Sequence, residues 1–394
     1  MGKQLIPELR FPEFDDLWSF DIVNNRAKKL KVGFVGTCEP FYTDKESGVL
    51  LIRTGNLKGV DIVLDDVKYV TSNFHKKNIK SQIYPDDLIL ARHGGKGEIC
   101  LVPKDFPTAN CLNIVILRVD NSVNSKFFQL IYGSASIQKQ IIAVTAGSTQ
   151  TVINTKEIGK LNFKFPTLPE QQKIASFLTD VDDKITKLTK KKDLLEQYKK
   201  GIMQKIFSQD LRFKDDDGNA FPDWDLKKLG EIFKISAGGD IDKINVSKEK
   251  SRDFKFPIFA NSEKQKGLYG YSNIYKIDFE CVTVTGRGSL GNAIARYDKF
   301  YPIVRLLVLK PKINLNVFFF ENAINQLNIL SESTGVPQLT APQISTYKIG
   351  YPSLKEQTKI ANFLSDIDLK IEELNTNIEN SKSFKKGLLQ KMFV

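Results

Sequence analysis

The chain has 394 residues, 41% of them hydrophobic, so it is long enough to bury the cores of two or three domains. Its net charge of +12 and isoelectric point near 9.2 favour a polyanionic partner such as nucleic acid. No apolar run approaches the roughly 18 residues that a membrane span requires, and the N-terminus lacks a signal-peptide pattern, so we expect a cytoplasmic protein.

Residues 1–164 have the composition of a mixed α/β domain. "VLLIRTGNL" at 49–57 and "VDIVLDDVKYV" at 60–70 are rich in β-branched and apolar residues and predict strands. A helix is predicted over 124–143. Four cysteines are scattered without a C-x-x-C pair, so we expect buried thiols and neither a disulfide framework nor a metal site.

Residues 165–208 predict one long helix. After "PTLPEQQKIASFL" at Pro166, apolar residues alternate at spacings of four and three, which is typical of a coiled coil. About 37 helical residues would span roughly 55 Å, so the helix is predicted to be a spacer and a docking element. Lys192 and Lys199 interrupt the apolar row. The row begins with Ile174, Leu178, Val181, Ile185 and Leu188 and continues with Leu195, Ile202 and Ile206.

Residues 209–350 predict a second mixed block, with strands over 254–277 and 281–297 and a helix over 317–333. Residues 351–394 then repeat 165–208: without a gap, Phe165–Phe207 and Tyr351–Phe393 are identical at 20 of 43 positions. The second apolar row begins with Ile360, Leu364, Ile367, Ile371 and Leu374, continues with Ile378, Leu388 and Met392, and is interrupted by Ser381 and Lys385. The sequence therefore predicts an α+β protein in which two pseudo-repeated mixed α/β domains are separated by two long antiparallel coiled-coil helices.

Polar side chains suited to DNA gather at the predicted turns of both blocks. Arginine and lysine reach guanine and phosphate, and asparagine and glutamine reach adenine. Two of the turns, "HGGKG" and "RGSLGN", share a G-x-x-G spacing that fits either a plain hairpin or a loop holding a phosphate. The predicted DNA-binding residues are Arg53, Asn56, Arg92, His93, Lys96 and Gln150 in the first block, and Asn261, Lys264, Lys266, Arg287, Ser289, Asn292 and Gln338 in the second.

Signatures of catalysis are missing from the sequence. There is no phosphate-binding loop, no metalloprotease histidine pair and no G-x-S-x-G elbow. The N-P-P-[YF] and F-x-G-x-G elements of an amino-methyltransferase are absent as well. We therefore expect no catalytic and no metal-binding residues in this chain.

The arrangement resembles the specificity subunit of type I restriction-modification enzymes. The resemblance rests on the duplicated "FPTLPEQQKIASFLTDVDDKI" and "YPSLKEQTKIANFLSDIDLKI" and on the "LRFPEF" and "LRF…FPDW" openings, and it covers essentially the whole chain. It implies a non-catalytic subunit whose two target recognition domains each read one half of a split, asymmetric double-stranded DNA site. The long helices would fix the gap and dock two modification (methyltransferase) subunits, through which restriction subunits join. S-adenosylmethionine, Mg²⁺ and ATP would be used by those partners and not by this chain.

Two alternatives remain open at this point. One is a stand-alone DNA-modifying or DNA-cleaving enzyme, for which "DDLILARHGG" at 86–95 would be the acidic and basic patch. The other is a coiled-coil scaffold without a role in DNA binding. The scaffold predicts no salt-dependent binding to DNA, whereas phosphate contacts weaken steeply as salt rises.

Overall fold

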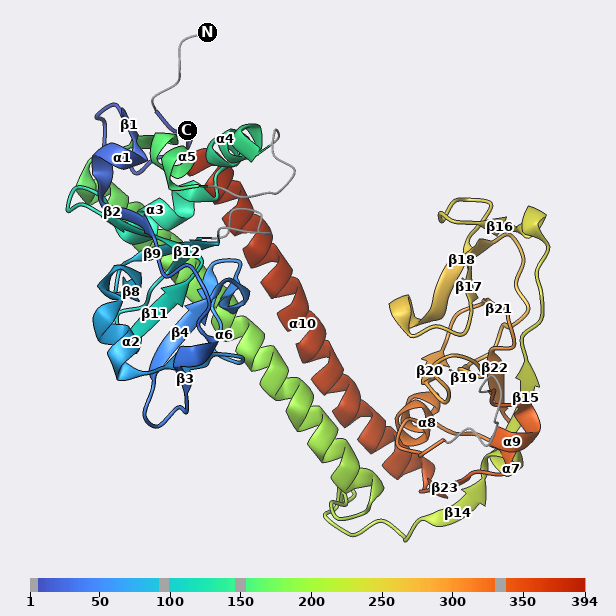
Figure 1. The fold of residues 1–394 in the computed structure, drawn as a ribbon. Helices are drawn as coiled ribbons and strands as arrows, with labels where there is room; N and C mark the ends of the chain where they lie inside the picture. The colour runs from blue at the N-terminus through green and yellow to red at the C-terminus, as the bar shows by residue number, and fades with distance from the viewer. Residues whose placement is uncertain (1–5, 92–98, 146–153, 330–337, 394) are drawn as a thin grey trace. The chain divides into compact units, whose positions relative to one another are not determined.

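The structure is a computed structural model that describes residues 6–91, 99–145, 154–329 and 338–393 (Figure 1). The chain divides into two compact units: unit 1 is Met1–Leu188 with Asn377–Val394, and unit 2 is Thr189–Thr376. Each unit contains one of the two divergent blocks and one half of each long helix. This division follows packing, whereas the four segments 1–164, 165–208, 209–350 and 351–394 follow the sequence repeat and stay a prediction.

Within the described residues, the first block in unit 1 forms four sheets. A small antiparallel pair joins β1 (Ser19–Ile22) to β13 (Asn162–Phe165), at the two ends of the block. A four-stranded sheet has the order β10-β9-β12-β2, and a five-stranded sheet has the order β3-β7-β4-β11-β8. Their strands are β2 (Ala27–Val32), β9 (Leu88–Ala91), β10 (Ile99–Leu101) and β12 (Ile114–Val119), and β3 (Tyr42–Thr43), β4 (Val49–Arg53), β7 (Lys68–Val70), β8 (Gln82–Ile83) and β11 (Ala109–Leu112). A further short hairpin joins β5 (Leu57–Lys58) to β6 (Asp61–Ile62).

Unit 2 repeats this plan. β14 (Asp225–Lys228) pairs with β23 (Lys348–Tyr351), as β1 pairs with β13. The sheet order β20-β19-β22-β15 corresponds to β10-β9-β12-β2, and a second four-stranded sheet has the order β16-β18-β17-β21. These strands are β15 (Phe233–Ala237), β19 (Cys281–Val284), β20 (Ala293–Arg296) and β22 (Leu307–Pro311), and β16 (Val246–Ser247), β17 (Phe256–Phe259), β18 (Leu268–Ser272) and β21 (Tyr301–Pro302). The repeat predicted from the helices thus extends to the divergent blocks.

The shorter helices differ in extent from the sequence prediction. The segment 124–143 forms two helices, α3 (Ser125–Tyr132) and α4 (Ala135–Thr145), separated at Gly133. Glycine is a poor helix former, and here it terminates α3. In unit 2, α8 (Val317–Ile324) covers only the first half of its predicted segment. Both α3 and α8 begin at an asparagine cap, Asn124 or Asn316, whose side chain accepts a hydrogen bond from the third helical residue.

The long helices have the predicted length and pair with each other. α6 spans Leu168–Phe207 and α10 spans Leu354–Met392, which is roughly 60 Å each at 1.5 Å per residue. Within each unit the two helices run side by side in opposite directions (Figure 1). The α+β class with two mixed domains and two long antiparallel helices is therefore confirmed.

Two lysines that interrupt the apolar rows form ion pairs between the helices. In unit 2, Lys199 Nζ lies 2.6 and 2.7 Å from the carboxylate oxygens of Asp368. In unit 1, Lys385 Nζ lies 2.5 Å from Asp182 Oδ1. Lys385 is the repeat equivalent of Lys199, and Asp368 is that of Asp182, so the two ion pairs are related by the internal pseudo-symmetry. They explain how a lysine is tolerated in a row of apolar residues, because each ammonium has a carboxylate on the facing helix.

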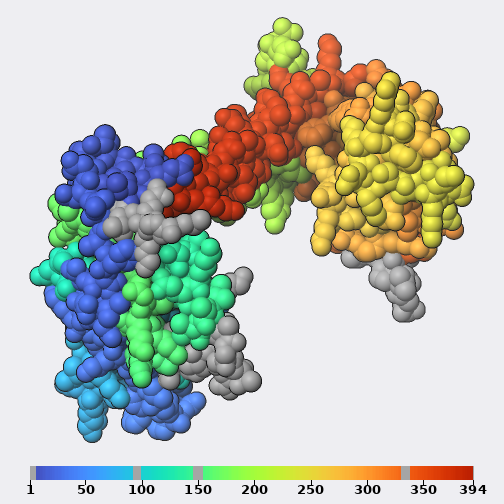
Figure 2. Space-filling model, turned by 90° about the horizontal axis from the view of Figure 1, so that it is seen from above, coloured from blue at the N-terminus to red at the C-terminus, as the bar shows by residue number. Residues whose placement is uncertain are grey.

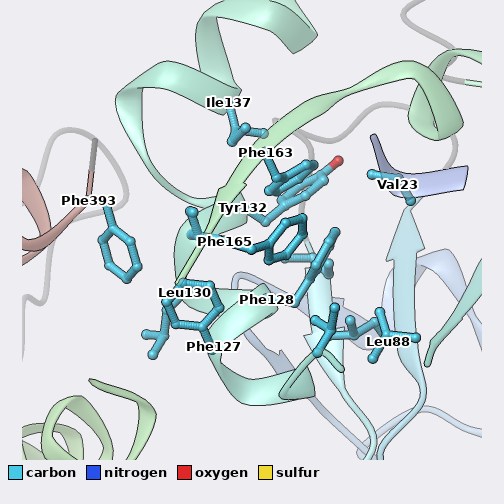
Figure 3. Packing of buried hydrophobic residues seen from close by; sticks show 14 of the residues in the cluster. Val23, Leu88, Phe127, Phe128, Leu130, Tyr132, Ile137, Phe163, Phe165 and Phe393 are labelled. Atoms are coloured by element: carbon cyan, nitrogen blue, oxygen red, sulfur yellow. The ribbon is translucent and has the colours of Figure 1, made fainter. Parts of the chain in front are cut away.

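Each recognition block takes its core from both long helices. In unit 1, Phe127 of α3 lies 5.7 Å, ring to ring, from Phe393 at the end of α10, and Figure 3 shows Phe393 beside Phe127 and Leu130. In unit 2, Phe319 of α8 lies 5.6 Å from Phe207 at the end of α6. Because Phe393 is the repeat equivalent of Phe207, the end of each long helix serves the other helix's block.

The predicted coiled-coil residues therefore fall into two groups. Those nearest the start of each helix are fully buried in the cores of the two units rather than between the helices alone: Ile174, Leu178, Ile360 and Leu364. The remainder lie further along α6 and α10. Ile367 and Leu374 are buried, whereas Val181, Ile185, Leu188 and Ile371 are partly buried.

The Glu-Gln pair of the repeated motif fastens each block to its helix. Glu170 is fully buried and accepts hydrogen bonds from Arg10 Nε at 2.8 Å and Nη2 at 2.7 Å, and from Trp18 Nε1 at 3.2 Å. Gln171 accepts from the backbone N–H of Asn124 at 2.9 Å and donates to Pro166 O at 3.0 Å. The motif thus joins the "LRF…W" opening, the start of α3 and the start of α6.

The second copy of the motif keeps one half of this joint. Gln357 accepts from the N–H of Asn316 at 2.9 Å and donates to Pro352 O at 2.9 Å, as Gln171 does in unit 1. Glu356 is equally buried, but its closest cation is Arg212 Nη2 at 3.6 Å, and neither carboxylate oxygen has a hydrogen-bond partner within the described residues. The same motif is therefore fully satisfied in unit 1 and loosely held in unit 2.

Candidate nucleic-acid interface

In unit 2 the structure brings the predicted DNA-binding turns together around Asn261. The Asn261 carboxamide accepts a hydrogen bond from Gly286 N at 2.7 Å, and its Nδ2 donates to Val304 O. Both ends of the amide are therefore engaged in joining three segments of backbone. Asn261, predicted as a DNA-reading residue, is placed as the residue that holds the neighbouring turns in position.

The turn after β19 carries Arg287 to the same place. Arg287 pairs with Gln338 through an isolated β-bridge, and its Nη2 lies 3.4 Å from Gln338 Oε1. Next to them, Leu339 N donates to Gly286 O at 2.8 Å. Arg287 and Gln338 were both predicted to bind DNA. They are 51 positions apart in the sequence, and the structure joins them as one polar pair.

Ser289 and Asn292 belong to a hairpin between β19 and β20. Asn292 O accepts from Thr285 N at 3.0 Å, and the Thr285 hydroxyl donates to Ser289 O. Gly288 and Gly291 have φ of +69° and +83°, the left-handed region that glycine adopts without strain. The "RGSLGN" segment is therefore a hairpin, and Ser289 is exposed on it while Asn292 is partly buried.

Lys264 and Lys266 lie in an exposed turn whose backbone is hydrogen-bonded by a buried arginine, Arg296. Arg296 is 7% exposed and donates to Lys266 O at 2.6 Å and to Thr283 Oγ1 at 3.0 Å. Its guanidinium carbon lies 3.6 Å from the centre of the Phe259 ring. Burial lowers the pKa of Arg296 to about 10, so the side chain stays charged at neutral pH. Figure 2 shows the yellow segment that contains this turn at the surface of unit 2.

In unit 1 the structure describes only Arg53 and Asn56 of the predicted set. Asn56 is 4% exposed and its amide holds the loop: it accepts from Arg53 N at 2.9 Å and donates to Val63 O at 3.1 Å. Arg53 Nη2 lies 3.0 Å from Asp66 Oδ2, and Asp66 itself is largely exposed. Like Asn261, Asn56 therefore has its amide engaged by backbone groups, but those groups belong to its own loop. Arg92, His93, Lys96 and Gln150 lie outside the described residues.

The alternative enzymatic patch has a structural explanation where it is described. Asp87 is fully buried, and its two carboxylate oxygens accept from Arg118 Nε at 2.6 Å and Nη2 at 2.8 Å. His75 makes a hydrogen bond to Asn110 across 2.7 Å. Within the described ranges, no group of three or more metal-ligating side chains is found, and no helix is long and apolar enough to span a membrane. All four cysteines are buried, as predicted.

Sequence reasoning missed Val304 and Arg305 at this surface. Both have positive φ, 52° and 64°, in the segment that leads into β22, and both are exposed. The run "RLLVL" from Arg305 to Leu309 is mostly apolar, and such a pattern gives no signal of a left-handed turn. Arg296 was missed for a similar reason, because an arginine in a predicted strand does not reveal that it is buried.

Comparison with known proteins agrees with this architecture. The family model "Type I restriction modification DNA specificity domain" matches residues 6–197 and 222–381. A putative type I specificity subunit of Mycoplasma pneumoniae is 29% identical over 278 residues, covering 70% of this chain and 73% of that protein. A type I restriction enzyme specificity subunit of Methanocaldococcus jannaschii is 24% identical over 350 residues, covering 81% of each protein.

Solved structures show the same fold. The crystal structure of a type I restriction-modification S subunit from M. genitalium superposes with a TM-score of 0.64 at 18% identity, covering 99% of both chains. Two copies of one α+β plan, each fastened to two long antiparallel helices, define the class of type I specificity subunits. The chain belongs to the type I restriction-modification DNA specificity family. Members of this class are non-catalytic components of restriction-modification complexes, so the prediction of a non-catalytic subunit is confirmed.

Proposed function

We propose that this chain reads a bipartite, asymmetric double-stranded DNA site, one half with each block. The observation that carries the proposal is that the two blocks share the order of one four-stranded sheet and the glutamine that fastens each block to its long helix, while their turn residues differ. Equivalent scaffolds place the reading turns equivalently, and unlike side chains on those turns read unlike half-sites. The net charge of +12 suits a polyanionic partner.

The chemistry would reside in partner subunits. The two modification subunits would methylate adenine with S-adenosylmethionine, and restriction subunits would use ATP and Mg²⁺ on the same DNA in the cytoplasm. This chain would supply sequence recognition and a fixed geometry. The rival enzyme would need a catalytic carboxylate, and Asp87, the buried member of its candidate patch, is occupied by Arg118.

Salt dependence separates this proposal from a scaffold without DNA. The complex of this chain with its modification subunits is expected to bind duplex DNA with an affinity that falls steeply with salt, because each phosphate contact releases a counterion. Titration of a labelled duplex at about 50 mM and at about 200 mM salt should show that the affinity falls by at least about 10³-fold if six or more phosphates are contacted. Absence of binding at the lowest salt would support the scaffold.

Docking of two modification subunits is supported by exposed aromatic residues at equivalent positions. Tyr198 on α6 is 51% exposed, and its repeat equivalent Phe384 on α10 is 58% exposed. Buried aromatic residues contribute much of the binding energy at protein interfaces. One such position on each helix fits two identical partners, each bound in the same way.

Substitution of one aromatic residue should therefore remove one partner. We expect Tyr198→Ala or Phe384→Ala to weaken one of two docking sites about tenfold or more and to shift the complex from two modification subunits per chain toward one. Mass measurement of the purified complex at low concentration reads this directly. Leu226→Ala, which alters a residue 66% exposed on β14, is the control that should keep both partners. Retention of two partners by the double variant would exclude this docking surface.

The spacer role predicts an effect of helix length on the gap. A heptad inserted in α6 after Leu188, with a matching heptad in α10 after Ile378, keeps every facing pair in register because both insertions fall at the same level of the antiparallel pair. Seven residues add about 10 Å of helix. The expected result is a gap longer by up to about three base pairs at 3.4 Å each, or loss of methylation. An unchanged site with an unchanged gap would exclude the spacer role.

A further inference from the structure

Four backbone segments of unit 2 converge on one exposed point. Asn261 joins Gly286 and Val304, and Leu339 N bonds Gly286 O. A side chain on Gly286 would lie 2.8 Å from Leu339 O and 3.2 Å from Arg305 O, so these backbones are in close contact. Residues from four distant parts of the sequence thus meet beside the exposed side chain of Arg305.

The backbone at Arg305 is held in a conformation that the chain would not adopt unaided. Val304 has φ of 52° and Arg305 has φ of 64°, and a β-branched residue in the left-handed region is a rare outlier. The conformation is maintained by Val304 N donating to Gly239 O at 3.0 Å and Arg305 N donating to Gly238 O at 3.1 Å. Backbone strain of this kind persists where surrounding structure enforces it, and it gathers at ligand-contacting sites.

The two exposed arginines of this surface are in different states. Arg287 is oriented by Gln338, with Nη2 and Oε1 3.4 Å apart. The Arg305 guanidinium has no hydrogen bond or ion pair to any of the residues that the structure describes. Its five donors are therefore available to a partner, and the planar fork matches O6 and N7 of guanine in the major groove.

The internal repeat assigns different roles to these two arginines. The sequence of the first block also has a G-x-x-G spacing, with Gly94 and Gly97 in place of Gly288 and Gly291, and it has Gln150 in the place of Gln338. Features common to both blocks suit what two unlike half-sites have in common, the phosphate backbone. The first block has a left-handed residue in the place of Val304: Asn113 has φ of 55°, and its N–H donates to Phe34 O at 2.9 Å as that of Val304 does to Gly239 O. The next residue, Ile114, accepts from Gly33 N, whereas in unit 2 the equivalent acceptor for Gly238 N is Leu306, so Arg305 is one extra residue in unit 2. Arg305 therefore suits the bases that distinguish one half-site.

We propose that Arg305 reads a guanine in the half-site of unit 2, and that Arg287 with the Gly288–Gly291 turn holds the adjoining phosphates. This proposal rests on the proposed function and deepens it by naming a specificity-determining residue. Asn261 is the positioning residue for both arginines, because its amide bonds the backbone of Gly286, just before Arg287, and of Val304, just before Arg305.

The test uses the complex of this chain with its modification subunits and a pool of DNA duplexes of randomised sequence. Bound duplexes are sequenced for the wild type and for Arg305→Ala, Arg305→Lys and Arg287→Ala. With Arg305→Ala, preference for one G·C pair should fall about 5- to 100-fold, while the other half-site is unchanged. Arg305→Lys keeps the charge but lacks the bidentate fork, so it should lose the same preference while retaining the salt dependence.

Arg287→Ala should behave differently. It is expected to weaken all sequences alike and to reduce the slope of log affinity against log salt by about one, as for a phosphate contact. Arg252→Ala removes an exposed arginine outside these turns and controls for charge. Because Arg252, Arg287 and Arg305 are exposed, we expect all variants to keep the unfolding temperature of the wild type.

Unchanged base preferences in Arg305→Ala, or an equal loss on all sequences, would overturn the assignment of Arg305. A wild-type complex that selects no sequence from the pool would instead overturn the proposed function. The two failures are therefore distinct in the same experiment.

Discussion

Exchange of residues 11–151 for the corresponding block of another specificity subunit is expected to change one half of the methylated sequence and to leave the other half unchanged. The reason is that, in the part of the chain that the structure describes, every strand of the unit 2 sheets lies within 225–351. The donor block needs a tryptophan for Glu170 and a backbone N–H for Gln171, since these contacts fasten the block to α6. Mapping of methylated adenines in cells that carry the hybrid chain measures the outcome.

A reciprocal exchange of residues 213–337 is the matched control, and it should change the opposite half. Both hybrids keep α6 and α10, so the gap between the half-sites should stay constant in each. A change in both halves, or in neither, would show that the blocks do not read DNA independently.

Glu170→Gln is expected to destabilise unit 1 strongly, by up to about 3–5 kcal/mol. This variant removes the charged partner of Arg10, whose side chain is only 10% exposed, and an unpaired buried charge is costly. It also weakens the hydrogen bond from Trp18 Nε1. Chemical unfolding followed by tryptophan fluorescence measures the loss, since Trp18 lies in the affected core.

Glu356→Gln is the matched variant at the equivalent position of the repeat. It is expected to cost less than about 1 kcal/mol, because the Glu356 carboxylate has no hydrogen bond within the described residues and its cation lies at 3.6 Å. A neutral amide in the same place also removes a buried charge. An equal loss of unfolding free energy in Glu170→Gln and Glu356→Gln would mean that Glu170 and Glu356 are held equally well in solution.

Features written in local periodicity were predictable from the sequence. The two long helices, their apolar rows and the repeat follow from spacings of three and four residues and from direct alignment of the two copies. Glycine spacing between two β-branched runs at "RGSLGN" indicated a turn, either a plain hairpin or a loop holding a phosphate, and the structure has a hairpin there. These signals lie within one segment of chain, so no knowledge of distant contacts was needed.

Features that depend on contacts between distant segments were not predictable. Asn56 and Asn261 have the chemistry of adenine-reading residues, but the amide of Asn56 is used by backbone groups of its own loop, and that of Asn261 by backbone groups at Gly286 and Val304. The Glu-Gln motif was visible as a repeat, yet its partners Arg10 and Asn124 are far away in the sequence. The left-handed backbone at Val304 follows from the packing of Gly238 and Asn261 against it.

The sequence likewise did not predict that the end of each long helix packs into the core of the block that precedes the other helix. Phe207 and Phe393 end their helices with the same motif, which suggests equal roles but not the block that each one serves. Only the contacts of Phe207 with Phe319 and of Phe393 with Phe127 reveal that each core is completed by the other helix. This arrangement explains why the motif at the ends of the helices is kept nearly identical in both copies.

The proposal that one chain reads two unlike half-sites at a fixed gap can be tested directly. The measurement is a genome-wide map of adenine methylation in cells that contain this chain and its modification subunit, compared with cells that lack the chain. We expect a methylated motif of two unlike short halves with one fixed gap, present only with the chain. An identical map in both kinds of cell, although the chain co-purifies with the modification subunit, would show that the chain does not direct methylation in this way.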